Sequence, residues 1–318
     1  MYLGSTWPHR MKQNHNLQQI IDGKKLNKYK DCEDFHQIID LDQLSEQEFA
    51  LCLKEVIVTR SLGCKNLAQF HDISLRDMTL CSRFGSSTFG NGTCRDVIDG
   101  NYKLNENILY FVLDGVLNGL NYLHSHQMIH RAIQGSNIVL GNPVLLKGLQ
   151  YSSLINNHTQ CHSLPPDLDK RLPWASPEMI RQDRSGYNHK TDVYSVGITI
   201  LELLAGCAPF EGFPNTKIYL LKLSSQTMLP FSQGSGPSSI SRRLVRVIDK
   251  CVQFDPDDRH DVPSLLKSSF FSKMKSKSSN LDIDLFDKYS QMRKAEEGLS
   301  NHIIDSNSIN KLSCDWLF

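Results

Sequence analysis

The stretch IHRAIQGSNIVL, residues 129–140, contains the polar side chains most suggestive of a catalytic loop. His130 and Arg131 are followed by Asn137 at the spacing of the pattern H-R-D-x-x-x-x-N. In that pattern the Asp accepts the proton of an attacking hydroxyl during phosphoryl transfer. Ala132 stands in its place, and a methyl group accepts no proton. The stretch therefore has the spacing of a phosphoryl-transfer loop without its base.

The groups that would bind a metal ion and phosphates for such chemistry are missing too. Phosphoryl transfer spreads negative charge over several oxygens, and carboxylate-bound metal ions neutralise most of it. Where a D-F-G triplet would supply the metal-binding Asp, this chain has Gly148, Leu149 and Gln150. The position of a phosphate-binding strand lysine falls on Gln37, and no G-x-G-x-x-G precedes it. We therefore expect no catalytic residue and no metal site.

Two polar residues have two interpretations each. Asn137 either ligates a metal ion or only holds its loop by a hydrogen bond, and we favour the hydrogen bond because one ligand does not make a site. Glu55 either pairs with a cation on a strand or is a solvated helix residue. We favour solvation, because Gln37 offers it no charge.

Charge and composition exclude several classes of protein. With 35 Lys and Arg against 34 Asp and Glu, the 318-residue chain lacks the charge excess that nucleic acid or an anionic membrane attracts. Nine cysteines without a C-x-x-C pair favour buried thiols over a disulfide framework or a zinc site. The polar N-terminus is no secretory signal, and the longest apolar run, interrupted by Glu202, is too short to span a bilayer. We expect a cytoplasmic protein, also present in the nucleus, with neither nucleic acid nor membrane as its partner.

Strands and two helices are predicted before the loop. A short strand is expected within residues 34–44, and two more around a polar turn at residues 74–77. The helix between them begins with a capping box of Ser45 and Glu48 and ends near Gly63. Residues 85–105 read as loop. The apolar faces are expected to comprise Phe49, Leu53, Val56 and Ile57 in that first helix, and Leu109, Val112, Leu113, Val116, Leu120 and Leu123 in a longer helix within residues 106–125.

After the loop the chain is expected to be mostly helical. PVLLKGL, residues 143–149, has a buried-strand pattern, and residues 192–206 are apolar all round, as suits a helix at the centre of a lobe. The Ser-, Pro- and Gly-rich stretch 224–241 predicts an exposed loop. Two helices follow, within residues 243–256 and 262–271. The polar tail after them is expected to be extended or disordered, apart from its final CDWLF.

Four motifs follow one another in the order and spacing of a protein kinase. They are the loop already described, PWASPEM (173–179) in place of A-P-E, KTDVYSVGITILELLAGCAPF (190–210) and CVQFDPDDRHDVPSLL (251–266). Over roughly residues 30–272 the chain thus resembles a protein kinase. The resemblance implies an α+β, two-lobed protein kinase-like fold. A poorly patterned segment at residues 1–30 would precede a small, degraded, β-rich N-lobe at 31–83, a larger helical C-lobe at 84–272 and a polar tail at 273–318.

The resemblance also implies structural roles for the residues that remain. Glu178 would pair with Arg259, Asp192 would cap the backbone of the loop, and His130 would pack between them. Arg131 and Asn137 complete this kinase framework. None of these residues moves a phosphate, so the pattern fits a scaffold that has lost its chemistry.

A more specific resemblance rests on RLPWASPEMIRQD (171–183) and on the long stretch at residues 186–223. Both are similar to the STE20-related adaptor (STRAD) pseudokinases, as is the triplet at residues 148–150. Members of that family end in an acidic residue followed by Trp-Glu-Phe. This chain ends Asp315, Trp316, Leu317, Phe318, so Leu317 departs from the family.

The resemblance implies an adaptor rather than an enzyme. Such proteins bind and allosterically activate a Ser/Thr kinase of the liver-kinase-B type. A helical-repeat scaffold of the calcium-binding-protein-39 type grips the C-terminal motif, which would make Trp316, Leu317 and Phe318 the partner-binding residues. From residue type alone, the two rings either dock into a partner or fold back on their own domain, and the resemblance favours docking.

Both the binding of ATP and the presence of catalytic activity have alternative interpretations. The family binds ATP without catalysis, but its glycine-rich stretch and strand cation are missing here, so we expect no cofactor and leave ATP binding without a metal open. The alternative from the enzyme class is a weak atypical Ser/Thr protein kinase of STE20 type that uses Asn137. A third hypothesis is a scaffold without any allosteric effect.

Overall fold

The structure is a computed structural model of the whole chain. It describes residues 37–76, 79–84, 92–100, 104–155, 160–182, 185–224 and 240–275. The N-terminal segment 1–30, most of the Ser-rich stretch 224–241 and nearly all of the tail, including Trp316, Leu317 and Phe318, lie outside these ranges.

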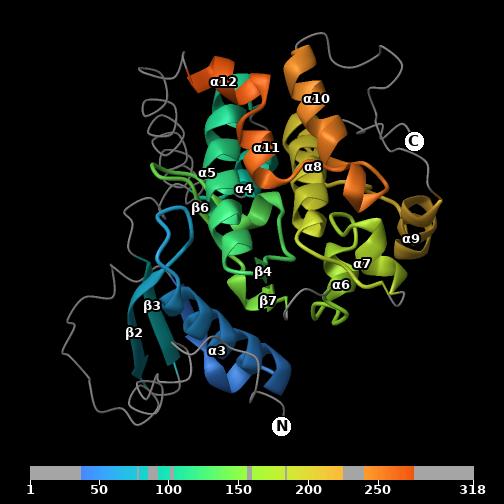
Figure 1. Cartoon of the computed structure of the whole chain (residues 1–318). Coiled ribbons are helices and arrows are strands. Elements are labelled where there is room, and N and C mark those ends of the chain that lie inside the picture. The colour runs from blue at the N-terminus through green and yellow to red at the C-terminus, as the bar shows by residue number, and fades with distance from the viewer. Residues whose placement is uncertain are drawn as a thin grey trace, which may run out of the picture.

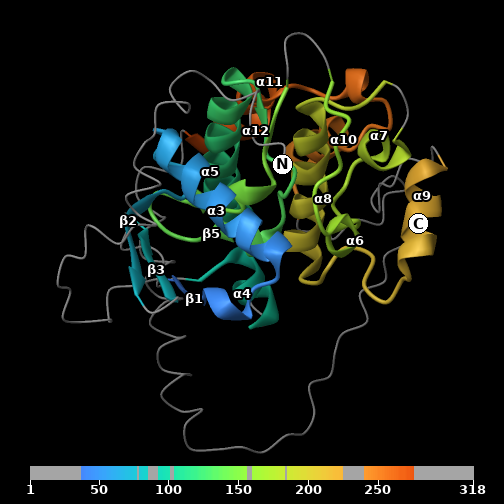
Figure 2. The same ribbon diagram turned by 90° about the horizontal axis from the view of Figure 1, so that it is seen from below.

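The smaller lobe consists of one antiparallel sheet and one helix (Figure 1). Strands β1 (Gln37–Asp40), β2 (Phe70–Arg76) and β3 (Thr79–Phe84) lie in the order β1-β3-β2. A 3-10 turn, η2 (Leu41–Gln43), and α3 (Glu46–Ser61) connect β1 to β2. Helix α3 contacts β2 on one side and the helical lobe on the other, and Figure 2 shows it along the underside of the molecule.

The start of α3 confirms the predicted capping box. The Ser45 hydroxyl accepts from the Glu48 N–H, and the Glu48 carboxylate accepts from the Ser45 N–H at 2.9 Å. The helix ends at Ser61, two residues before Gly63. The predicted apolar face is wrong in part, since Val56 is buried but Phe49 is 37% exposed. Residues 46–50, the first turns of α3, are all exposed, whereas the buried residues Val56, Val58 and Thr59 lie in its second half.

Two further local predictions need correction. Strand β2 continues to Arg76 because residues 74–76 pair with β3, so the turn expected at residues 74–77 begins too early. The stretch read as loop contains a helix, α4 (Cys94–Asp99), whose N-terminus has a second capping box, made by Thr93 and Asp96. The capping box was not predicted because the glycines on both sides of it are typical of a loop.

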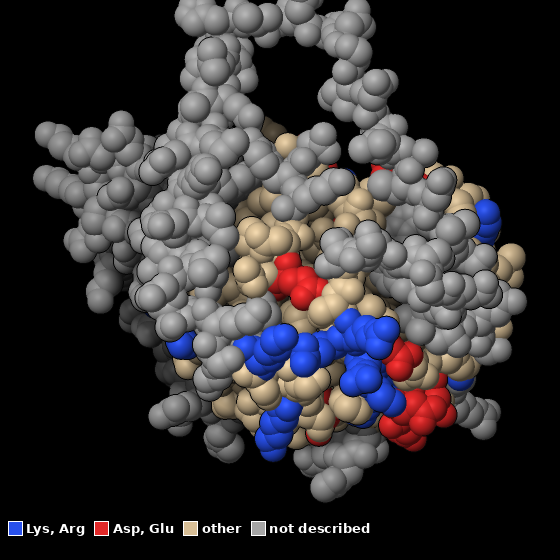
Figure 3. All heavy atoms as spheres, turned by 90° about the horizontal axis from the view of Figure 1, so that it is seen from above, with Lys and Arg blue, Asp and Glu red and all other residues tan. Residues whose placement is uncertain are grey.

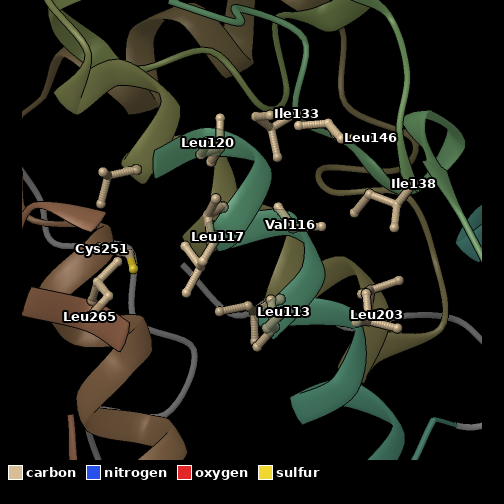
Figure 4. Packing of buried hydrophobic residues seen from close by; sticks show 14 of the residues in the cluster. Leu113, Val116, Leu117, Leu120, Ile133, Ile138, Leu146, Leu203, Cys251 and Leu265 are labelled. Atoms are coloured by element: carbon tan, nitrogen blue, oxygen red, sulfur yellow. The ribbon is translucent and has the colours of Figure 1, made fainter. Parts of the chain in front are cut away.

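The larger lobe is built around two long helices, α5 (Glu106–Ser125) and α8 (Lys190–Ala205). The predicted face of α5 is confirmed, because its six apolar residues are at most 1% exposed. Figure 4 shows four residues of this helix, Leu113, Val116, Leu117 and Leu120, within a cluster that takes side chains from several other elements. Helix α8 is buried along nearly its whole length, as its apolar sequence predicts.

The remaining elements surround this pair. Helices α10 (Arg242–Cys251), α11 (Val262–Leu266) and α12 (Ser269–Lys275) pack on one side of it, and α9 (Asn215–Leu223) lies at the edge. The second of the two helices predicted after the Ser-rich stretch is therefore two short ones, α11 and α12. The other short elements are β4 (Met128–Ile129), η4 (Gly135–Asn137), β5 (Ile138–Val139), β6 (Leu145–Leu146), η5 (Leu149–Tyr151), β7 (Ser153–Leu154), α6 (Leu168–Arg171), α7 (Pro177–Arg181) and η6 (Pro256–Asp258).

The arrangement confirms an α+β fold with a small sheet lobe and a larger helical lobe. Among the helices of the described ranges, none has the length and apolar character of a membrane span.

Candidate functional site

The loop at residues 130–137 connects β4 to β5 and is fixed by one carboxylate from α8. Asp192 accepts from the backbone N–H groups of His130 and Arg131, at 2.8 Å in each case. His124 Nε2 lies 2.9 Å from the same carboxylate. Burial alone would raise the pKa of Asp192, but the hydrogen bond and charge of His124 hold it below its usual value. The expected capping role of Asp192 is therefore present, and the carboxylate is fully engaged in it.

His130 serves the same loop as a neutral side chain. It is fully buried, and burial lowers its pKa to about 4. Nδ1 accepts from the Ala132 N–H at 3.2 Å, so Nε2 carries the proton and donates to the Lys147 carbonyl at 3.1 Å. His130 thus connects the loop to the residue that precedes Gly148.

The two positions where carboxylates are missing lie on either side of Asn137. The Asn137 amide donates to the Ala132 carbonyl at 2.8 Å, which is the loop-holding role favoured from the sequence. Gly148 has a φ of +93°, and a Cβ built on it would lie 2.8 Å from Asn137 Nδ2. Real Cβ atoms do not approach neighbours this closely, so no side chain fits at position 148 without a rearrangement. Among the residues that the structure describes, no group of three or more His, Cys, Asp or Glu could hold a metal ion.

The residues after Gly148 are held by the smaller lobe. Helix α3 packs on η5, where Leu149 is completely buried. Lys54 Nζ donates to the Ser152 carbonyl at 2.7 Å, and burial, with the nearby Arg131 charge, lowers the pKa of Lys54 to about 8. Sequence reasoning missed Lys54, because nothing in its local pattern separates it from a surface lysine.

Glu55 does not behave as the solvated residue that we expected. Burial raises its pKa to about 7, opposed by the charge of Lys147 and by the Gly148 N–H. The half-buried carboxyl therefore lies close to Lys147 and Gly148, near the position of the missing metal ligand. The prediction failed because the cation it faces comes from residue 147 and not from a strand. Gln37 begins β1, where it pairs with Ser82, and its side chain lies outside the described residues.

Arg131 anchors the segment 148–178. The structure describes this segment except for residues 156–159. The Arg131 guanidinium donates to the carbonyls of Tyr151 at 2.7 Å and Ser163 at 2.8 Å, and to the Tyr187 hydroxyl at 3.0 Å. The side chain is 8% exposed, so these bonds replace water. Arg131 therefore holds the first half of this segment through the carbonyls of Tyr151 and Ser163.

The far end of the same segment is fixed by the pair expected between Glu178 and Arg259. The two side chains form a bidentate ion pair with distances of 2.7 and 2.8 Å. Arg259 is 2% exposed and also donates to the Gln253 carbonyl at 2.7 Å.

Two buried residues that sequence reasoning missed strengthen this end. Lys222 of α9 donates to the Ala175 carbonyl at 2.7 Å, and burial holds its pKa well below the usual value. Glu202 of α8 accepts from the Gly135 N–H at 3.0 Å and from Trp174 Nε1 at 2.9 Å. The only signal for Glu202 was its position as a charged residue within an apolar helix.

A cavity of about 10 Å³, the room of about one water molecule, lies between the loop and the segment that follows Gly148. Its lining includes Ala132, Arg171 and Trp174. The described part of the site therefore preserves the framework of hydrogen bonds and ion pairs.

Comparison with known proteins gives a consistent result. Residues 24–271 match the family described as protein kinase domain. STE20-related kinase adapter protein alpha from mouse and from human are each 28% identical, over 76% of this chain and 66% of their own length. Human STE20-related kinase adapter protein beta is 31% identical over 57% of this chain and 54% of its own length. The match thus covers between 54% and 66% of the length of these three relatives.

Proposed function

Since the chain belongs to the protein kinase domain family, we propose that it is a pseudokinase adaptor of the STE20-related type. In this proposal it binds and allosterically activates a Ser/Thr kinase of the liver-kinase-B type. A helical-repeat scaffold of the calcium-binding-protein-39 type completes the complex through the tail. The relatives that are named kinase adapter proteins support the adaptor part of the proposal.

One observation carries the inactive part of the proposal, namely the packing of Gly148 on Asn137. Metal-assisted phosphoryl transfer needs a carboxylate at the first position and a free side chain at the second. Gly148 has no side chain, and the Asn137 amide bonds the Ala132 carbonyl. The alternative of a weak kinase that uses Asn137 would have to break this bond and find a carboxylate elsewhere.

The adaptor part of the proposal is supported by the bonds that hold the segment 148–178, which is the surface that we propose for the partner kinase. Arg131 bonds the segment 148–178 at Tyr151 and Ser163, and Arg259 bonds it at Glu178. Lys54 bonds the beginning of the segment to α3. An effector activates a partner by binding its active state better than its inactive state. A surface with a fixed shape makes that discrimination at little entropic cost.

The experiment combines this protein, the scaffold and the partner kinase and measures phosphorylation of a peptide substrate of the partner. We expect a rise of about 5–150-fold, the usual range for a coupling of 1–3 kcal/mol. A parallel reaction contains a partner kinase whose own catalytic Asp is replaced, so any remaining phosphate transfer belongs to this chain. Transfer there would favour the weak kinase, and binding without a rise in activity would leave only the scaffold hypothesis.

The tail is tested separately by deleting residues 316–318. We expect the scaffold to be lost from a pull-down, because two aromatic anchors are removed. Leu317→Glu restores the residue of the family and should strengthen scaffold binding if that carboxylate pairs with a cation. Unchanged scaffold binding after the deletion would contradict the docking role of the tail.

A further inference from the structure

The exposed face of α10 carries a stripe of cations that the proposed function does not use. Arg242, Arg243, Arg246 and Lys250 are exposed, whereas the opposite face of the helix, with Leu244, Val247, Ile248 and Cys251, is buried. The helical period therefore divides α10 into one apolar and one basic side. Figure 3 shows Lys and Arg side chains gathered in a band on this side of the molecule.

These cations have no ion-pair partner among the described residues. Lys267, exposed at the end of α11, is unpaired in the same sense. Two carboxylates near α10, those of Glu106 and Asp249, accept hydrogen bonds from other groups. Glu106 accepts from the Ser241 N–H at the start of α10, and Asp249 accepts from Gln253 Nε2 at 2.9 Å. Like charges on one helix face repel each other, which leaves the stripe suited to an anionic ligand.

We infer that the stretch at residues 281–287 of the same chain, LDIDLFD, binds the basic face of α10. It contains Asp282, Asp284 and Asp287 and no cation. The residues that precede α10, 225–239, contain neither Asp nor Glu and cannot neutralise the face. Charge complementarity thus points to the first acidic stretch after α12.

The length of the connection permits this contact. Helix α12 ends at Lys275 and contacts α10. The nine residues from there to Asp284 can span up to ~30 Å, and a helix of the length of α10 is about 15 Å long. A tethered ligand has an effective concentration in the millimolar range, so weak charge pairs are sufficient.

The surroundings disfavour a membrane or a nucleic acid as the ligand. Asp255, Asp257 and Asp258 are exposed in or beside η6, close in sequence to the end of α10. A bilayer or a duplex would bring its own phosphates against these carboxylates, whereas a short peptide can avoid them. The net charge of +1 also gives no long-range attraction to a polyanion.

The test is zero-length carbodiimide cross-linking of the full-length protein, read by mass spectrometry. We expect amide links from the carboxylates at residues 282–287 to the amines of Lys250 or Lys267. The links should be lost in an Asp282→Asn, Asp284→Asn, Asp287→Asn variant and fall several-fold when Arg242, Arg243 and Arg246 are replaced by Ala. An equal mixture of isotope-labelled and unlabelled protein separates links within one chain from links between chains.

The matched control replaces two other acidic residues of the tail, Glu296→Gln and Glu297→Gln, and should leave the links unchanged. The absence of links in the wild-type protein would overturn the inference. So would links that join only different chains, since the ligand would then be a second copy. Links that survive the three arginine substitutions would show that the basic face does not attract the stretch.

Discussion

At the scale of single residues, the backbone geometry of Gly148 is connected with the missing metal-binding carboxylate at that position. Its φ of +93° and its 2.8 Å approach to Asn137 mean that a carboxylate cannot simply be restored there. We predict that Gly148→Ala destabilises the protein by ~2–4 kcal/mol, of which ~1–2 is backbone strain and the rest steric overlap. Thermal unfolding measures the loss.

Gly206 provides the matched control, because it has a φ of +72° and no atom within 4 Å of the place where a Cβ would lie. Gly206→Ala should therefore cost only the strain of ~1–2 kcal/mol. Equal losses for the two variants would mean that the space at position 148 is not closed.

The Glu178–Arg259 pair gives a second prediction at this scale. Glu178→Gln leaves Arg259 buried without its counter-charge, which costs ~3–5 kcal/mol. Denaturant unfolding should show this loss. The ion pair of half-buried Arg95 and exposed Asp99 is the control, since Asp99→Asn removes a 2.9 Å pair whose carboxylate lies at the surface and should cost less than ~1 kcal/mol. A loss of that small size for Glu178→Gln would contradict the role of the pair.

Glu55 gives a prediction about pH. Its pKa is 4.5 in the unfolded chain and about 7 in the folded protein. Between these values the folded state holds a proton that the unfolded state has lost, so the free energy of unfolding falls as pH rises through this window. The Glu55→Gln variant has no carboxyl group at this position, so its free energy of unfolding should not show this fall.

The measurement is the melting temperature of the wild type and of Glu55→Gln from pH 4.5 to 7.5. The advantage of the variant should grow with pH, towards ~1–3 kcal/mol at the upper end. His130 titrates in the opposite sense but is present in both proteins, so its contribution cancels in the difference. Two parallel curves would mean that Glu55 is solvated after all.

At the scale of helices and strands, the sequence predicts features that depend on residues within one element, such as the apolar face of a helix or its N-terminal cap. The α5 face and the α3 capping box follow from side chains within one element, and both are confirmed. The exposure of Phe49 could not be predicted, because it depends on the tertiary contacts of α3 and not on the period within it. The same holds for Lys54 and Glu55, whose environments come from residues about a hundred positions later.

The contact of α3 with η5 leads to a prediction about local stability. Lys54→Met removes the hydrogen bond to the Ser152 carbonyl and leaves that acceptor unsatisfied. We expect faster amide hydrogen exchange in η5 and in the C-terminal half of α3, with little change in α5. Lys65→Met at an exposed position is the control and should change neither region. Unaltered exchange in η5 would mean that apolar packing alone holds the contact.

At the scale of the whole molecule, side chains of lysine and arginine connect the described parts of the two lobes. Helix α3 bonds η5 directly, and Arg131 connects η5 to the segment that follows it. The sequence shows that the phosphate-binding groups are missing. It could not show that lysine and arginine side chains, bonded to backbone carbonyls, take over the connection.

This arrangement makes a prediction about nucleotides. Neither a metal-binding carboxylate nor a glycine-rich loop is encoded, so magnesium–ATP at 1 mM should bind with a dissociation constant above that concentration. A ligand at its dissociation constant stabilises a protein by only ~0.4 kcal/mol, so the melting temperature should rise by less than ~2 °C. ATP without magnesium, measured in parallel, tests the binding mode that the sequence left open. A rise of many degrees with either form would show that the nucleotide, rather than the contacts of Lys54 and Arg131, holds the lobes together.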